Sequence, residues 1–321
     1  MQKCLVFGSL NLDYFYTVDH IIAPKETQSA PQMQCFCGGK GLNQAVALSQ
    51  GGASVNFAGC LGQASSLLTE TLTQYHISTE FLRQVDQPAG HAIIQVDGNG
   101  QNAILVYPGS NFAVTSEQID ETLAHFQKGD LLVIQNEINR LNELICKAHQ
   151  RGLIIALNPS PVPVDPKALP LELVDLLFIN EVEGAFFSSE NDPQAILDYF
   201  AKTLPDTQII LTLGDQGSCL QTGRLRISMP CCPVEVIDTV GAGDTFTGFF
   251  LAAKLAGKSA LNCLAMATAA SGCAVSKKGA SASIPSLAET MALLNKHRDY
   301  LWNQKIEFLK RLGKIPAFFI S

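Results

Sequence analysis

The residues best suited to chemistry lie late in the chain, in the stretch DTVGAGD at 238–244. Gly241 and Gly243 allow backbone conformations and close approaches that a side chain would prevent. A glycine turn that opens a helix points N–H groups outward at the positive end of the helix dipole, where phosphate binds. Asp244 would stand beside that phosphate, in the first helical turn. A carboxylate base next to an anion hole, here Gly241, Ala242 and Gly243, is what phosphoryl transfer to an alcohol requires.

This stretch also has two alternative interpretations. An Asp in a first turn stabilises the helix dipole without any chemistry. A dinucleotide-dependent oxidoreductase is disfavoured, because the spacing is Gly-x-Gly-x-x-x-x-Gly rather than G-x-G-x-x-G, and no Walker A sequence occurs.

The β-branched run at 234–237 predicts a strand before the turn, and the apolar run 249–255 predicts a helix after it.

A second glycine turn, GGKGLNQ at 38–44, opens a helix predicted over 42–50. Its glycines would let backbone N–H groups approach a ligand closely. Lys40 and Asn43 could form hydrogen bonds with hydroxyl groups. The alternative is a tight corner between two elements that binds nothing.

Further polar residues follow predicted strands, where open α/β sheets bind ligands. These residues are Asn11, Asp13, Glu137, Asn180, Glu183, Thr212, Gly214 and Gly217. Each has a plain alternative: a turn for the first two and the last three, exposure to water for Glu137, and a helix capping box for the Asn180/Glu183 pair. Glu183 could also act through water on a phosphate-bound Mg²⁺, since Mg²⁺ keeps most of its waters.

The composition describes a globular chain of 321 residues, of which 47% are hydrophobic, with a net charge of −7. That charge argues against a general nucleic-acid binder. No apolar run reaches the ~18 residues of a membrane span, and no signal peptide is evident, so we expect a cytoplasmic protein. The ten cysteines are then expected to be reduced and mostly buried. Their spacing disfavours a zinc site.

The elements that must position these residues alternate regularly, which predicts a parallel sheet covered by helices on both faces. Strands are expected at 4–7, 54–60, 130–135, 153–157, 176–179 and 208–213. Helices are expected at 66–75, 116–126, 141–150, 193–203, 259–276 and 286–297. Strands 14–18 and 28–37 and a hairpin of 91–96 with 103–107, around the turn at 97–100, predict a small β-sheet lid. We therefore expect a single Rossmann-like three-layer domain, 1–321, with a lid at about 12–37 and 90–110 and a C-terminal tail at 299–321.

Taken together, these motifs resemble the PfkB carbohydrate kinase family, and its ribokinase branch most. The matching stretches are GSxNxD at 8–13, GGKGxNQA at 38–45, LNP at 157–159, NExE at 180–183, TLGxxG at 212–217, DTxGAGDTFxG at 238–248 and KGA at 278–280. They occur in the family's order and extend to about residue 288. The combination of GGKG with DTxGAGD is highly specific.

The resemblance implies a β lid that often forms a dimer contact, and phosphorylation of a sugar hydroxymethyl group by ATP. Ribose is the first expectation, with 2-keto-3-deoxygluconate, fructose or a nucleoside as alternatives. Asp244 would be the general base. The sugar would contact Asn11, Asp13, Gly39, Lys40, Gly41, Asn43 and Glu137. ATP would contact Asn180, Thr212, Gly214, Gly217, Gly243 and Thr268. A K⁺ would bind at Asp238, Val240, Ala274, Lys277, Gly279 and Ser283, mostly through carbonyl groups.

The sequence departs from the family pattern in two places. The family's GxDxxG pattern is absent after Gly62, where residues 63–68 read QASSLL. Lys25 stands where a glycine is usual. These departures motivate the alternative of a sugar sensor without catalysis, which the presence of Gly241, Gly243 and Asp244 disfavours.

Overall fold

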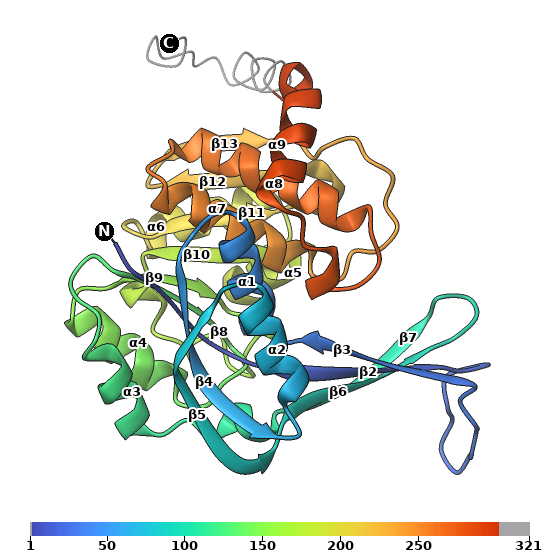
Figure 1. Ribbon diagram of the computed structural model, residues 1–321. Helices are drawn as coiled ribbons and strands as arrows, with labels where there is room; N and C mark the ends of the chain where they lie inside the picture. The colour runs from blue at the N-terminus through green and yellow to red at the C-terminus, as the bar shows by residue number, and fades with distance from the viewer. Residues whose placement is uncertain (1, 302–321) are drawn as a thin grey trace.

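A nine-stranded sheet forms the centre of the computed structural model, which describes residues 2–301 (Figure 1). The strand order is β13-β12-β11-β10-β9-β8-β1-β4-β5, and all neighbours are parallel except at β12 and β13. The strands are β1 (Cys4–Phe7), β4 (Val55–Gln63), β5 (Ser78–Pro88), β8 (Leu131–Gln135), β9 (Ile154–Asn158), β10 (Leu176–Asn180), β11 (Gln208–Thr212), β12 (Ser218–Thr222) and β13 (Leu225–Met229).

Helices cover both faces of this sheet, so the expected three-layer architecture is confirmed. One face carries α1 (Lys40–Gln50), α2 (Ser66–Gln74), α7 (Ala242–Leu255) and α8 (Ala260–Val275), with α9 (Leu287–Lys296) packed on α8. The other carries α3 (Ser116–Leu123), α4 (Leu141–Gln150), α5 (Glu181–Ser188) and α6 (Pro193–Thr203). Successive residues of a strand point to opposite faces. In β1, Cys4 and Val6 therefore enter one core while Leu5 and Phe7 enter the other.

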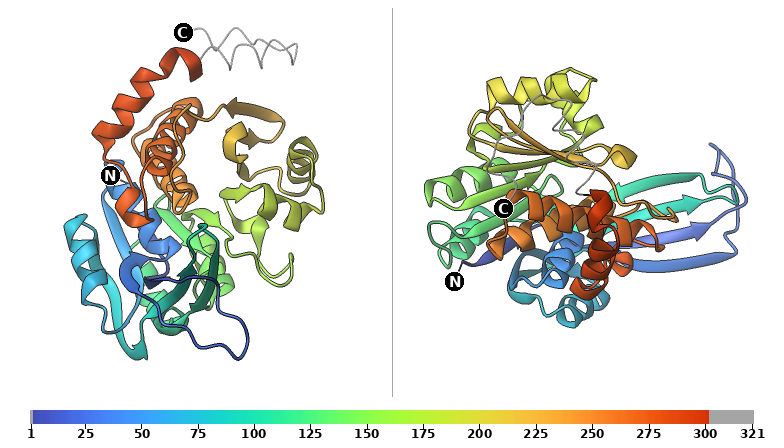
Figure 2. Two further views of the ribbon diagram at one scale, coloured as in Figure 1. Left: turned by 90° about the vertical axis from the view of Figure 1, so that its right-hand side faces the viewer. Right: turned by 90° about the horizontal axis from the view of Figure 1, so that it is seen from above.

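A second, four-stranded sheet projects to one side of the main body (Figure 2). Its order is β3-β2-β6-β7, from β2 (Asn11–Thr17), β3 (Gln32–Gly38), β6 (Gly90–Val96) and β7 (Asn102–Tyr107). The hairpin predicted around residues 97–100 is confirmed, and the Asp97 carboxylate accepts the N–H groups of Asn99 and Gln101 within its turn. The pairing of β2 with β6 is parallel, which places both predicted pieces in one sheet.

The strand predicted at 234–237 is wrong. That segment has no strand pairing, and Val236 and Ile237 are 61% and 53% exposed. The N–H groups of Ile237 and Asp238 instead donate to the Val275 carbonyl, at 2.8 and 3.1 Å. The segment therefore lies against the C-terminal end of α8, where the Val275 carbonyl accepts hydrogen bonds that a strand would give to a neighbouring strand.

Several other boundaries differ from the expectations. Helix α7 begins at Ala242, so the glycine turn opens a helix with Asp244 in its first turn, as expected, and the helix includes the apolar run 249–255. Strands β5, β12 and β13 and helix α5 were not predicted as such. Most of the predicted tail, residues 302–321, lies outside the described residues. Within residues 2–301, no helix is long and apolar enough to cross a membrane.

Candidate active site

The Asp244 carboxylate lies in the first turn of α7 and is 7% exposed. Each of its oxygens accepts a hydrogen bond from α1: Asn43 Nδ2 donates to Oδ2 at 3.0 Å, and Gln44 Nε2 donates to Oδ1 at 2.9 Å. The two glycine turns predicted from the sequence are therefore joined directly through this carboxylate.

The contact depends on close packing of α1 against α7. A Cβ on Gly248 would lie 2.3 Å from Ala47 Cβ and 2.8 Å from the Leu48 nitrogen. Such distances are shorter than any tolerated contact, so glycine is required where the helices approach. The small residue at 248 thus brings the start of α7 to the start of α1.

The glycine turn at 38–41 packs against the loop after β1. A Cβ on Gly41 would lie 2.4 Å from the Ser9 nitrogen, and one on Gly38 would lie 1.9 Å from Asp13 Oδ2. Gly41 N–H donates to Ser9 Oγ at 3.1 Å. Gly39 has φ of 90° at the N-cap of α1. This turn is therefore a filled corner, in which the Ser9 backbone and the Asp13 carboxylate occupy the space that side chains would need.

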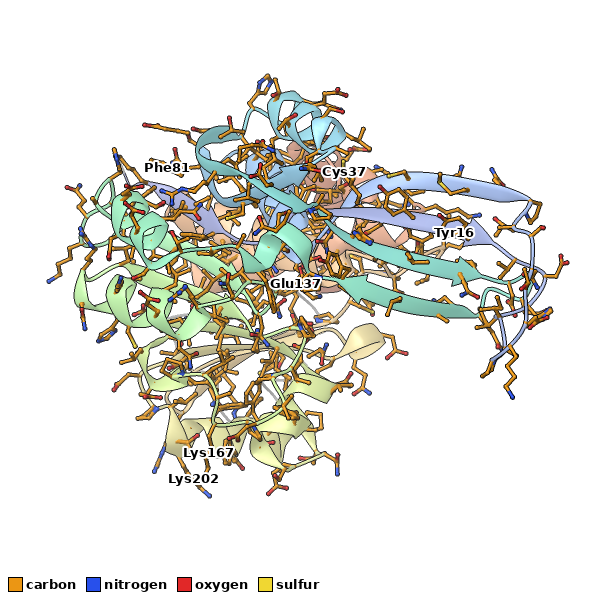
Figure 3. The ribbon with its side chains drawn as sticks, turned by 90° about the horizontal axis from the view of Figure 1, so that it is seen from below. Tyr16, Cys37, Phe81, Glu137, Lys167 and Lys202 are labelled. Carbon is orange, nitrogen blue, oxygen red and sulfur yellow. The ribbon has the colours of Figure 1, made fainter. Side chains whose placement is uncertain are left out.

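Three charged groups predicted to bind the sugar gather at this corner. Glu137 is labelled in Figure 3, near the place where the small sheet meets the main body. Its carboxylate accepts the Ser9 hydroxyl and, at 2.8 Å, the Lys40 N–H. Burial raises the pKa of Glu137, opposed mainly by the Lys40 ammonium. Burial, and then the charge of Glu137, raise the pKa of Asp13 to about 6. The Asp244 carboxylate is the main cause that raises the pKa of Lys40.

Two buried amides have orientations set by their neighbours. Asn11 Oδ1 accepts from Asn111 Nδ2 at 2.7 Å, and Asn111 Oδ1 accepts the Leu10 N–H at 2.9 Å. Asn111 belongs to the 3₁₀ helix η1 (Gly109–Phe112) and is 2% exposed. The Asn11 amide is therefore oriented with its NH₂ group as the remaining donor. Asn43 Oδ1, in contrast, is buried and has no hydrogen-bond partner among the described residues.

The glycine turn at 241–243 leaves open space beside Gly243, at the N-terminus of α7. Gly241 is the N-cap with φ of 74°. A Cβ on Gly243 would have no atom of the described residues within 4 Å. The first N–H groups of a helix lack intrahelical partners, so this open end can receive an anion. Ala242 N–H makes a long 3.3 Å contact with the Thr239 carbonyl.

The predicted nucleotide residues are distributed over neighbouring strand ends. Asn180 and Glu183 form a capping box, with Asn180 Oδ1 accepting the Glu183 N–H at 2.8 Å and Glu183 Oε2 accepting the Asn180 N–H at 2.9 Å. This confirms the capping interpretation of that pair. Thr212 is the register partner of Asn180 in the sheet. Gly214 is the first residue of the 3₁₀ turn η3 (Gly214–Gln216) and Gly217 follows its end, with φ of 54° and 93°.

Thr268 lies on α8 and is 6% exposed, and its hydroxyl oxygen has no hydrogen-bond partner among the described residues. A buried hydroxyl without a partner costs free energy unless a ligand satisfies it. Thr268 therefore fits the role of a group that faces a bound molecule.

The predicted K⁺ residues lie on two segments that the structure brings together. Asp238 accepts the Val240 N–H through Oδ1 at 3.0 Å and the Gly279 N–H through Oδ2 at 2.9 Å. The Ser283 hydroxyl donates to the Ala280 carbonyl at 2.8 Å. The Ala274 carbonyl accepts the Lys277 N–H at 3.0 Å. A carbonyl oxygen has two lone pairs, so the Ala274 and Ala280 carbonyls can each accept a further ligand.

Comparison with known proteins places the chain in a family. The model of the pfkB family carbohydrate kinases matches residues 1–287. The chain belongs to the pfkB family of carbohydrate kinases. Among pfkB proteins it is 34% identical over 306 residues to the ribokinase of Haemophilus influenzae, covering 92% of this chain and 99% of that protein. The ribokinase of Staphylococcus aureus is 33% identical over 302 residues, covering 90% and 98%.

Solved pfkB-family structures agree with this placement. The structure of Arabidopsis thaliana ribokinase complexed with ribose and ATP has a TM-score of 0.82 at 29% identity, covering 92% of this chain and 99% of that one. The ribokinase of Thermotoga maritima has a TM-score of 0.82 at 33% identity, covering 92% and 100%. The family resemblance drawn from the motifs is thereby confirmed.

Some residues of this pfkB site had no role assigned from the sequence. They are Ser9, Gln44, Asn111 and Gln135. Gln135 carried a signal, because it is a polar residue that closes the buried apolar run of β8. Asn111 carried none, since its partner Asn11 is far from it in the sequence.

A hollow of about 530 Å³ lies elsewhere, between β5 and α3. Its lining includes Phe81, Arg83 and His125 and none of the predicted site residues. Arg83 pairs there with Glu121 at 2.6 Å. This hollow is therefore separate from the candidate site.

Proposed function

We propose that this protein is a sugar kinase that transfers the γ-phosphate of ATP to the hydroxymethyl group of ribose. The observation that carries the proposal is the Asp244 carboxylate, held by Asn43 and Gln44 between the polar corner of α1 and the open N-terminus of α7. The similarity to ribokinases over most of the chain supports ribose as the sugar.

The proposed reaction begins with the sugar held at the polar corner. Asn11 donates through its remaining N–H groups, Asn43 Oδ1 accepts from a sugar hydroxyl, and Asp13 and Glu137 accept from others. The turn from Gly39 through Lys40 to Gly41 closes the corner. This combination of donors and acceptors suits a polyol.

Asp244 then takes the proton of the sugar's hydroxymethyl group while the oxygen of that group bonds to the γ-phosphorus of ATP. The bond from that phosphorus to the bridging oxygen of ATP breaks, and ADP leaves. The N–H groups at Gly241, Ala242 and Gly243 stabilise the negative charge on the transferring group, which is the larger part of catalysis in phosphoryl transfer. Asp244 afterwards loses its proton to water.

The nucleotide would lie across the ends of β10 and β11. Asn180, Thr212, Gly214, Gly217 and Thr268 would contact it, with Gly243 at its phosphates. When bound, Mg²⁺ would neutralise charge on the phosphates, with Glu183 acting through water from the first turn of α5.

A K⁺ site would use oxygens of Asp238, Val240, Ala274, Lys277, Gly279 and Ser283. Its role would be to fix the segment that precedes the anion hole, to which Asp238 is already tied through Gly279. We expect higher activity in K⁺ than in Na⁺ at equal ionic strength. Equal rates in the two salts would count against the site.

We further propose a homodimer that forms through the small sheet, and a cytoplasmic location. The sheet exposes apolar side chains, including Met33, Ile104, Leu105 and Val106 at 52–68%. Large apolar side chains left exposed on both edge strands of a small sheet are a feature of interaction surfaces. The ten cysteines are all free, as a reducing compartment requires. Sedimentation of Leu105→Asp as a smaller species than the parent protein would support the dimer.

The function is tested by measuring ADP release with ribose, fructose, 2-keto-3-deoxygluconate and a nucleoside. We expect the highest kcat/KM with ribose. A different preferred substrate would assign another pfkB-family kinase. Saturable ribose binding without ADP release would favour the sugar sensor, and no response to any sugar would refute the proposal.

A further inference from the structure

Two buried amides form a chain behind the Asp244 carboxylate. Gln135 Nε2 donates to Gln44 Oε1 at 2.6 Å, and Gln44 Nε2 donates to Asp244 Oδ1 at 2.9 Å. Both glutamines are 0% exposed. The chain connects the end of the central strand β8 to the start of α7 through α1.

The direction of each hydrogen bond in this chain is fixed by its neighbours. Because the Gln44 oxygen is taken by Gln135, its NH₂ group must face Asp244. The same NH₂ group lies 3.4 Å from Asn158 Oδ1, and Asn158 Nδ2 donates to the Phe178 carbonyl at 3.0 Å. Gln44 is thus held from two sides in the one orientation that donates to Asp244.

Stability does not explain the glutamine at position 135. Its Oε1 atom is buried without a hydrogen-bond partner among the described residues, and it faces Gly8, where a Cβ would lie 2.4 Å away. An unsatisfied buried carbonyl costs about 1–3 kcal/mol, which an apolar side chain would avoid. What the amide contributes at this place is its bond to Gln44.

We propose that Gln44 is a positioning residue that aims the Asp244 carboxylate at the sugar hydroxyl, and that Gln135 acts only through Gln44. The inference rests on the proposed function, in which Asp244 is the base. With Gln44 and Asn43 each holding one carboxylate oxygen, the carboxyl group cannot rotate about its bond to Cβ. The lone pair that receives the proton is then fixed before the sugar binds.

The first experiment replaces Gln44 with methionine, which keeps the length of the side chain and removes its donor. Misplacing a reacting group by about 1 Å can cost about 10²-fold in rate, so we expect kcat to fall by up to about 10²-fold. KM for the sugar and for ATP should stay within about twofold, because Gln44 does not touch either substrate in the proposed arrangement. A raised KM with unchanged kcat would overturn the proposal. If Gln44→Met does not fold, Gln44→Asn serves instead, because its side chain is one methylene shorter and its amide lies farther from Asp244. The same changes in kcat and KM are then expected.

The second experiment is a double-mutant cycle with Gln135→Met. Alone, Gln135→Met should lower kcat less than Gln44→Met does. Asp244 keeps the Gln44 amide as its donor, but Gln135 no longer orients that amide. In the Gln44→Met background, Gln135→Met should have no further effect on kcat. Fully multiplicative effects of the two substitutions would show that Gln135 acts by another route and would overturn its part of the proposal.

The matched control is Gln118→Met. Gln118 is also a buried glutamine, 2% exposed, and donates to the Gly59 carbonyl at 2.8 Å on the opposite face of the sheet. Its replacement should leave kcat unchanged. Asp244→Asn is measured in the same assay: if it is inactive while Gln44→Met has normal kcat, the positioning role fails and the proposed function stands. If the parent protein phosphorylates no sugar, the proposed function itself fails.

Discussion

Two glycine-rich turns open two adjacent helices of this molecule, Gly38–Gly41 at α1 and Gly241–Gly243 at α7. At the first turn, added Cβ atoms would collide with the Ser9 backbone and the Asp13 carboxylate. At Gly243 an added Cβ would meet no described atom within 4 Å. The glycines of the first turn therefore allow the protein to pack on itself, whereas at the second turn Gly241 packs near Ala280 and Gly243 borders open space. Glycine at a helix N-terminus thus allows close packing in the first turn and leaves open space at Gly243 in the second.

The sharpest test of the open turn is Asp244→Asn. An asparagine can keep one of the two acceptor positions offered to Asn43 and Gln44, so we expect the fold and sugar binding to persist. Loss of the general base should lower kcat by ~10²–10⁴-fold. Steady-state kinetics with ribose and ATP measures this. A kcat near that of the parent protein would remove Asp244 from the base role.

Gly243→Ala should separate activity from stability at the same turn. The position is helical and has room for a methyl group, so stability should be unchanged or higher by about 0.5–1 kcal/mol. The methyl group would occupy the space proposed for phosphate, and we expect kcat/KM for ATP to fall by about 10²-fold. Thermal melting and kinetics on one preparation test both halves. Unchanged kinetics would mean that the open space is not used.

Gly41→Ala, at the filled turn, should lower stability, whereas Gly243→Ala should lower activity. Its methyl group would lie 2.4 Å from the Ser9 nitrogen, which is backbone and cannot move aside cheaply. Forcing an extra group into a packed site costs about 1–3 kcal/mol, so the free energy of unfolding should fall by that amount. Gly98→Ala, at an exposed hairpin turn with no described atom within 4 Å of the new group, is the control. Equal urea midpoints for the two variants would contradict the comparison.

The smallest expected effect is on pH dependence at the filled corner. Asp13 has a pKa of about 6, raised by burial and by Glu137, so its carboxylate gains a proton as the pH falls through that value. A protonated Asp13 loses acceptor capacity for sugar hydroxyls, and kcat/KM for ribose should fall by up to about tenfold between pH 6 and pH 5. Asp13→Asn should weaken this acid limb, leaving the part due to Glu137. If Asp13→Asn shows the same fall in kcat/KM at acid pH as the parent protein, the fall is due to a group other than Asp13.

Local signals in the sequence predicted much of the fold. The helices at 141–150 and 193–203 have the predicted bounds, and Asp192 caps the second of them. The capping box that was one interpretation of the Asn180/Glu183 pair formed, and Ser286 and Glu289 form another at the start of α9. These features depend on residues three or four apart, which the chain order alone brings together.

Predictions failed where a distant partner decides the outcome. The run at 234–237 has the composition of a strand, but it lies against the end of α8. Strand β12 pairs antiparallel with β11, and β13 pairs antiparallel with β12, which are pairings that local composition does not specify. In the site, Asn111 and Gln135 orient residues about 90 to 100 positions away, which no local spacing indicates.

The sequence by itself determined which chemical groups this protein has and the turns that carry them, because glycine spacing, capping and periodicity act over a few residues. Only the tertiary structure decided that Asp244 accepts hydrogen bonds from Asn43 and Gln44. It also decided that the turn at 38–41 is filled while space is left at Gly243, and which polar atoms of the buried amides stay unpaired. Those outcomes depend on how α1, α7 and β8 pack. Packing is set by the summed fit of the whole core rather than by any one stretch of the chain.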